Sequence, residues 1–256
     1  MIKFFRKIRQ NLLSEGKTGR YIKYAIGEII LVVIGILIAL QINNYNEVQK
    51  QRAKEIQFLK NLKADLFLEA NELERYIGIR ESMVNSAQII LEHFNGKPVD
   101  NIQLFNYHNF NVEIWQAFQR INNTFLELVN SGNLTIISND SIKNGLLNLD
   151  LIYKKILSDR EHLKHDYEQY LYEPFFQNVD LDPLAQSYGY FMNNGKFAEN
   201  LELSREELDG LLKNKVFKNG FVLSIFTNSI ILGDYQRMKE LNQKLVGWID
   251  NEISKD

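Results

Sequence analysis

The sequence contains no cysteine, and this absence excludes several kinds of site. Without thiols the chain has no disulfide framework, no thiolate ligand for a metal and no cysteine nucleophile. Proline is scarce too, with three in 256 residues, so little interrupts the long periodic runs described below. Few helix breakers and long runs of helical periodicity together predict an all-α protein.

Net charge is also small, at −2, but it is unevenly distributed. Residues 1–23 carry seven basic side chains against Glu15, a local charge of +6, which leaves −8 for the rest of the chain. The acidic bulk argues against a nucleic-acid partner. The basic start suits the anionic inner leaflet of a membrane. With 45% hydrophobic and 24% charged residues, the chain can bury a core.

Catalytic motifs are missing as well. There is no G-x-S-x-G, no phosphate-cradling glycine loop and no H-E-x-x-H. Asn178, Asp180 and Asp182 alternate like the start of a calcium loop, but Pro183 and Gly189 stand where such a loop requires Gly and Glu. We therefore expect no enzymatic activity and assign no catalytic, cofactor-binding or metal-binding residues.

One histidine pair needs separate treatment. His162 and His165 are three residues apart on a predicted helix, so both rings share a face, as a metal site would require. They lie within SDREHLKHDYEQ, a strongly charged run. A solvated helix face explains that run without a metal, and this interpretation is favoured.

The one long hydrophobic run covers residues 24–42, YAIGEIILVVIGILIALQI. Nineteen residues make a helix of about 28 Å, close to the hydrocarbon thickness of a bilayer. Twelve of them are Ile, Leu or Val, and the only charge is Glu28, near the start. A buried soluble helix would normally show a polar face, and a signal peptide would end in a small-residue cleavage site. The run therefore predicts an uncleaved transmembrane signal-anchor.

Charge bias gives that anchor a direction. Seven Lys and Arg residues precede it, against four in residues 43–62. The positive-inside rule then predicts that residues 1–23 are cytoplasmic and that residues 43–256 form an extracytoplasmic, periplasmic domain of an inner-membrane, single-pass protein. Gly35 and Ala39 form a small-xxx-small pair that would allow two spans to associate.

The span leads into a predicted long helix over residues 43–94. From Ile56 to Phe94 a 3-4 spacing marks twelve seam positions, ten of them apolar; Lys63 and Arg80 are the exceptions. The seam fits either an intermolecular coiled coil or a helix inside an antiparallel bundle. Leu62, Phe67, Leu68 and Ile79 widen the apolar face, which favours the bundle.

The remaining chain predicts further helices. We expect a short helix capped by Asp100, one over 112–129, a long one capped by Asp140 or Ser141 that Pro174 ends, one begun by a Ser204–Glu207 capping box, and one over 216–253. Residues 172–200 are predicted to be irregular and are rich in aromatics. Either they form a contact surface for sugar or protein, or they plug the end of the bundle, which is favoured.

Three stretches resemble a family of uncharacterised single-pass bacterial membrane proteins, a domain-of-unknown-function family. They are MIKFFRKIRQNLLSEGK, YAIGEIILVVIGILIALQINNYNE and, more weakly, FLELVNSGNLTIISNDSIKNGLL. Such proteins often read N-N-W-N-E after the span, where this chain has Tyr45. The resemblance implies a membrane-anchored helical protein and carries over no catalytic residues.

These observations predict a membrane-anchored interaction or scaffold protein of the cell envelope, whose partners are the lipid bilayer and a protein or a second copy. A ligand-binding sensor domain that works through a partner is the alternative. A metal-dependent enzyme using His162 and His165 is a third and weaker hypothesis.

Overall fold

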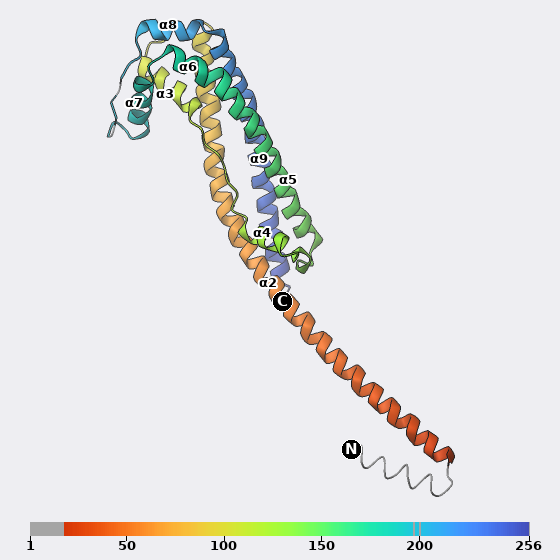
Figure 1. Cartoon of the computed structure of the whole chain (residues 1–256). Helices are drawn as coiled ribbons and strands as arrows, with labels where there is room; N and C mark the ends of the chain where they lie inside the picture. Colours follow the sequence, from red (N-terminus) through yellow and green to blue (C-terminus); the bar gives the residue numbers. More distant parts are fainter. Residues whose placement is uncertain (1–17, 197, 200, 256) are drawn as a thin grey trace. The chain divides into compact units, whose positions relative to one another are not determined.

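The computed structural model describes residues 18–196, 198–199 and 201–255, and the described part of the chain is all-α (Figure 1). The elements are α2 (Thr18–Phe94), α3 (Ile102–Glu113), α4 (Asn123–Asn130), the 3₁₀ turn η1 (Leu134–Ile136), α5 (Asp140–Tyr167), the π turn η2 (Glu168–Tyr172), α6 (Glu173–Asn178), α7 (Leu181–Met192), α8 (Arg205–Lys213) and α9 (Lys215–Ile253). The chain divides into two compact units, residues 1–57 and 58–256.

Within the first unit, α2 carries the apolar run predicted to be the span. Its large side chains are exposed, from 47% at Val33 and Ile34 to 67% at Leu31. By length and composition, α2 and α9 are both long and apolar enough to cross a membrane, but their cover differs. None of the most apolar window of α2 is buried, whereas 39% of the corresponding window of α9 is.

The second unit contains three long helix segments side by side: α2 from Phe58 onward, α9 and α5 (Figure 1). Lys63 on α2 pairs with Asp250 on α9 at 2.5 Å, and Lys218 near the start of α9 donates to Asn95 at 2.7 Å. Since residue numbers rise along α2 as they fall along α9, the two helices are antiparallel. The same reasoning makes α5 and α9 antiparallel, because Gly145 contacts Leu245 and Tyr167 bonds Ser224.

The predicted seam of α2 supplies much of the core. Leu59, Leu66, Leu73, Ile77 and Ala87 are buried at seam positions. Leu62, Met83 and Ile90, off the seam, are buried as well, because α2 contacts more than one neighbour. Phe67 and Leu68, which were expected to widen this face, are instead 66% and 50% exposed. From Phe58 onward, the apolar face of α2 therefore packs inside a helical bundle within the second unit.

The predicted helix over 112–129 is wrong. α3 ends at Glu113, and residues 114–122, here called the strap, run without helical structure to α4 (Figure 1). Tyr76 donates to the Ala117 carbonyl at 2.8 Å, so a side chain of α2 replaces a helical hydrogen bond. The apolar spacing that suggested a helix instead inserts Phe118 into the core, where it is 1% exposed.

Residues 172–200 were predicted to be irregular, and this too is corrected by the structure. They contain α6 and α7, which follow α5 through a π turn. Pro174 does not end the chain of helices, because it occupies the first turn of α6, where its missing N–H is not needed. Pro183 likewise falls in the first turn of α7, after the capping residue Asp180.

Two other predicted boundaries agree with the structure, whereas two predicted caps do not, since α5 is capped by Asn139 and not by Asp140 or Ser141. Ser204 and Glu207 make the reciprocal hydrogen bonds of a capping box at α8. α9 begins at Lys215, one residue before the predicted start, and ends at Ile253. The cap of α3 is Asn101, which accepts a hydrogen bond from the Leu104 amide, and not its neighbour Asp100.

Candidate functional site

A hydrogen-bonded polar node joins the three long helices in the core of the second unit. Arg80 on α2 donates from Nη1 to Asn228 Oδ1 on α9 at 2.7 Å. The Asn228 amide nitrogen donates to the Tyr167 hydroxyl on α5 at 3.0 Å and to Ser224 Oγ at 3.0 Å. Arg80, Tyr167, Ser224 and Asn228 are each at most 1% exposed. We call these four side chains the polar node.

Arg80 also ties the strap to the node. Its Nη2 donates to the Gln116 carbonyl at 2.7 Å, and its Nε is buried without a hydrogen-bond partner. The acceptors at 2.7 Å are thus an amide oxygen and a backbone carbonyl, both neutral. A guanidinium cannot lose its proton in a protein, so the node holds a positive charge in the core.

The strap carries a buried arginine of its own, Arg120, which is paired with a carboxylate. Arg120 Nε lies 2.7 Å from Glu69 Oε1, and both side chains are at most 3% exposed. Burial raises the pKa of Glu69, while Arg120 opposes that rise. Asn242 on α9 donates to the Leu66 carbonyl at 3.0 Å and to Glu69 at 3.3 Å, so the pair connects the strap, α2 and α9.

Glu113, the last residue of α3, is a buried carboxyl of a different kind. Asn109, one turn earlier, donates to its Oε1 at 2.9 Å. Burial raises the pKa of Glu113 to about 8, against an ordinary value of 4.5, and the Asn109 hydrogen bond opposes the rise. The group is therefore largely protonated at neutral pH. Its backbone carbonyl accepts a hydrogen bond from the Tyr172 hydroxyl of η2.

Ser86 and His108 are within hydrogen-bond distance of each other, at 3.0 Å between Oγ and Nδ1. A serine and an imidazole at this distance could form a nucleophile and its base. Ser86, however, is only 2% exposed, and Asn111 also donates to its Oγ, at 2.9 Å. A nucleophile closed off in this way cannot reach a substrate, so the cluster serves to join α2 and α3.

The surface between α3 and α7 is aromatic and almost uncharged. The rings of Tyr107 and Tyr188 are stacked, with centroids 5.6 Å apart and planes at 14°. Phe191 lies 5.4 Å from Tyr107, and Phe110 lies 5.3 Å from Tyr188. We call the half-buried residues of this cluster the aromatic face: Tyr107, Phe110, Tyr188, Tyr190 and Phe191.

Few charges accompany the aromatic face. α7 carries a single charged residue, Asp182 in its first turn, and α3 carries only the buried Glu113. Burial lowers the pKa of His108, and nearby His93 lowers it further, so this imidazole stays neutral at physiological pH. α3 and α7 can therefore offer ring faces, hydroxyls and amides to a partner, with carboxylates at the edge, where Gln103 of α3 donates to Glu202 and Gln186 of α7 accepts from the Glu199 amide.

The aromatics of 172–200 are divided between two roles. Phe175 is fully buried against Phe217 at 5.7 Å, as expected of a plug at the end of the bundle. Tyr188, Tyr190 and Phe191 remain half-exposed on the aromatic face. Phe176 is 61% exposed and lies beside the rings of Tyr172 and Phe175. Phe197 lies outside the described residues.

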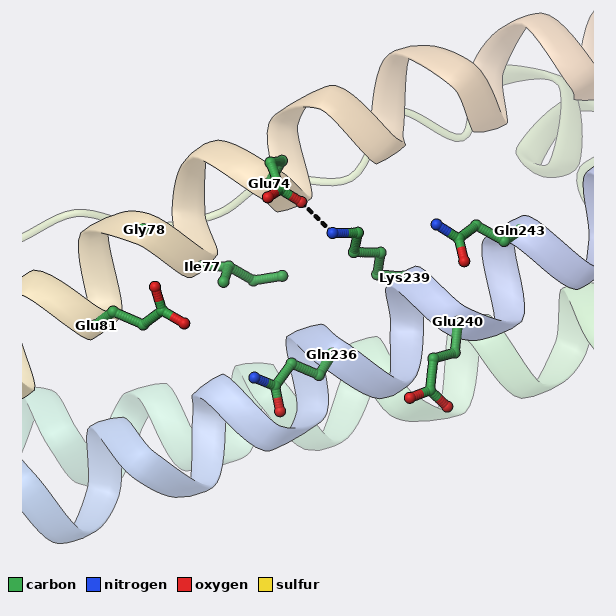
Figure 2. A pocket seen from close by; sticks show the side chains of 8 residues that line it. All are labelled: Glu74, Ile77, Gly78, Glu81, Gln236, Lys239, Glu240 and Gln243. Carbon is green, nitrogen blue, oxygen red and sulfur yellow. Dashed lines mark hydrogen bonds and ion pairs between the residues drawn. The ribbon is translucent and has the colours of Figure 1, made fainter.

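An open groove of about 520 Å³ follows the contact between α2 and α9 (Figure 2). In Figure 2 Lys239 reaches across it to pair with Glu74, and Glu81 and Glu240 lie on opposite helices. Its lining is mostly polar. The groove offers several carboxylates, but the one buried residue among its lining is the apolar Ile77, so the groove marks where the two helices meet at the surface.

The sequence offers two weak candidates for a metal site, and neither forms a ligand cluster in the described part of the chain. His162 and His165 are not part of any group of three or more potential ligands, and none occurs elsewhere among the described residues. The Asn178–Asp182 segment makes local caps: Asn178 donates to the Pro174 carbonyl at 2.6 Å, and Asp180 accepts from the Asp182 amide at 3.1 Å.

Sequence reasoning missed the polar node and Glu113. One signal for the node was available, because Arg80 breaks an otherwise apolar seam and a cation at such a position needs buried acceptors. Nothing comparable marks Asn228 or Glu113, since their burial depends on which helices cover them.

Comparison with known families supports one part of the resemblance drawn from the sequence, membership of a family of unknown function. Residues 28–193, well over half of the chain, match a family described as a family of unknown function (DUF6090). Searches of curated proteins and of solved structures gave no match. The chain therefore belongs to the DUF6090 family of unknown function.

Proposed function

We propose that this protein is a single-pass envelope protein whose helical domain, held at the inner membrane, acts as an interaction scaffold and not as an enzyme. In this proposal residues 24–42 span the bilayer, residues 1–23 are cytoplasmic, and residues 43–256 are periplasmic. The observation that carries it is an apolar helix segment of which no residue is buried, although contact with water is unfavourable for such a segment.

Insertion into lipid would remove the apolar segment of α2 from water. The apolar side chains from Ile29 to Leu40 point in every direction around α2 and none is covered. A helix that is apolar all round is stable only inside a protein core or a bilayer. The twelve Ile, Leu and Val residues of 24–42 favour insertion by at most about 4–7 kcal/mol in total. Glu28 lies about one turn inside the start of the run, where a carboxylate can reach the headgroups.

α9 passes the same test of length and composition, but its environment supports a different role. Asn228, Asp234 and Asn242 are buried on its inner side. Asp234 pairs with Lys155 of α5 at 2.7 Å. Moving α9 into lipid would break these interactions and leave their partners unpaired. We therefore assign α9 to the folded domain.

The aromatic face is the part of the domain best suited to a partner. Interfaces are enriched in Tyr and Phe and depleted of charge at their centres, as this surface is. The rings are fixed by mutual stacking, which reduces the entropy that a partner must remove on binding. A protein partner in the envelope, or a second copy of the chain, is the expected occupant.

Photo-crosslinking tests this proposal in the full-length protein in its native membrane. A photoreactive residue would replace Tyr107 or Tyr188, and a matched control would replace Phe226, which is exposed on α9 away from the aromatic face. We expect a discrete adduct of reproducible mass from the first two positions and none from the third. Equal labelling at all three positions, or no adduct at either tyrosine, would count against the aromatic face as the contact surface.

A further inference from the structure

The carboxyl of Glu113 is closed into the domain without a cation beside it. The residue is 6% exposed, and its one side-chain hydrogen bond comes from the neutral amide of Asn109. It also occupies the C-terminal end of α3, where the helix dipole disfavours a negative charge. Each of these features opposes an ionised carboxylate, independently of the others.

The ionisable groups that face Glu113 from other elements do not compensate for a charge there. Tyr167 of α5 and Tyr172 of η2 are phenols whose own pKa values are raised, first by burial and further by Glu113. The positive charge of Arg80 on α2 lowers the pKa of the Tyr167 hydroxyl. Glu168, at the start of η2, adds a like charge near Tyr172.

We propose that Glu113 is a proton switch: in the closed domain it is protonated, and loss of the proton to solvent releases the C-terminal end of α3 from η2. The inference does not depend on the proposed scaffold function. Ionised Glu113 needs water, and because Glu113 is the last residue of α3, a displacement of the last turn of that helix would expose its carboxylate. That displacement would break the hydrogen bond from Tyr172 to the Glu113 carbonyl.

The switch would reach the aromatic face through α3 itself. Tyr107 and Phe110 precede Glu113 on the same helix, and α7 packs against that helix with Tyr188 and Phe191. Trp115 follows Glu113 in the strap and lies edge-on to Tyr167, with ring centroids 6.1 Å apart. Opening should therefore change the surroundings of Trp115 as well as the exposure of α3.

The experiment uses the full-length chain in lipid nanodiscs between pH 6 and pH 10. Infrared spectroscopy would follow the carbonyl band of a protonated carboxyl, and hydrogen exchange would follow α3 and η2. A Trp248→Phe background leaves Trp115 as the single tryptophan, so that its fluorescence reports on the strap. The test variant is Glu113→Gln, which keeps the shape and the acceptor for Asn109; the control is Glu81→Gln, at an exposed position.

We expect a protonated carboxyl that titrates with a midpoint of about 8 and is absent in Glu113→Gln. At each pH the hydrogen-exchange rates of α3 and η2 are compared with those of Glu113→Gln. In the wild type and in Glu81→Gln this ratio should rise as the pH passes through about 8. An unchanged pH response in Glu113→Gln would overturn the proposal. Should that variant fail to fold, ¹³C-carboxyl labelling of glutamate in the wild type decides: no carboxyl titrating well above the ordinary range contradicts the switch.

Discussion

Arg80 on α2 donates a 2.7 Å hydrogen bond to Asn228 on α9, and this contact joins two helices 148 residues apart in sequence at the centre of the bundle. Asn228 passes the connection to Tyr167 on α5, while Arg80 extends it to the strap at Gln116. The node therefore specifies which helices meet and in what register, because a shift of one turn would leave a buried guanidinium without acceptors.

Asn228→Ala should destabilise the domain by about 3 kcal/mol, since it leaves Arg80, Tyr167 and Ser224 each short of a partner in the core. Chemical denaturation of the full-length protein in detergent would measure this. Asn219→Ala, at an exposed position on the same helix, is the control and should change stability by less than about 0.5 kcal/mol. Equal effects of the two variants would show that the node contributes nothing specific.

Phe118→Ala should cost about 3–5 kcal/mol, because it empties a site enclosed by aromatic rings. Phe118 lies 5.5 Å from Tyr76, 6.0 Å from Tyr153 and 5.4 Å from Tyr235, which come from three different helices. The measurement is the midpoint of thermal unfolding. Phe226→Ala removes the same ring from an exposed position and should leave the unfolding midpoint nearly unchanged. Equal midpoints for the two variants would show that the strap does not stabilise the bundle.

Gly220→Ala should destabilise α9 although alanine is the better helix former. An added Cβ would lie 2.6 Å from Leu171 Cδ2 and 2.7 Å from the Tyr170 carbonyl oxygen, so the π turn blocks it. Gly247→Ala, on the same helix, meets nothing within 4 Å and should stabilise by about 0.5–1 kcal/mol. Circular dichroism melts compare the pair, and a gain for both would mean that α9 and η2 are not in close contact.

Glu113→Gln should remove a pH dependence of stability. The carboxyl ionises at about 4.5 in the unfolded chain and at about 8 in the folded one, so between these values the folded state holds the extra proton. Stability is then fully present below about 4.5 and is lost as pH rises through 8, by at most about 1.4 kcal/mol per pH unit.

Over the whole window this amounts to about 5 kcal/mol as an upper bound. Urea denaturation at pH 5, 6, 7 and 8 would measure the slope in the wild type and the variant. Contributions from other groups, such as Glu69, are present in both proteins and cancel in the difference. Parallel slopes would contradict the assignment of Glu113 as a buried acid.

Local sequence patterns were sufficient for much of the fold. The apolar seam of α2 and the capping box at Ser204 each depend on residues close together in sequence, and both are found in the structure. They were read from spacing alone, since a helix face or a cap requires particular residue types at fixed offsets.

The failures share a physical cause. The strap has helical spacing, but Tyr76 and Arg80, about 40 residues away, bind its carbonyls and hold it extended. The sequence of residues 172–200 predicts irregular structure because proline usually interrupts a helix, but Pro174 and Pro183 both occupy first turns, where proline is tolerated. The burial of the polar node and of Glu113 depends on which helices pack over them, and this packing cannot be derived from local sequence patterns.

The most direct test of the account uses two reporter fusions, one after Asn214, in the connection before α9, and one after Asp256. Both α2 and α9 are long and apolar enough to cross a membrane, and the proposed topology places only α2 in the bilayer. It predicts that alkaline phosphatase is active, and a cytoplasmic fluorescent reporter dark, at both positions. Opposite results at the two positions would show that α9 also crosses the membrane, and cytoplasmic signals at both would overturn the proposed orientation.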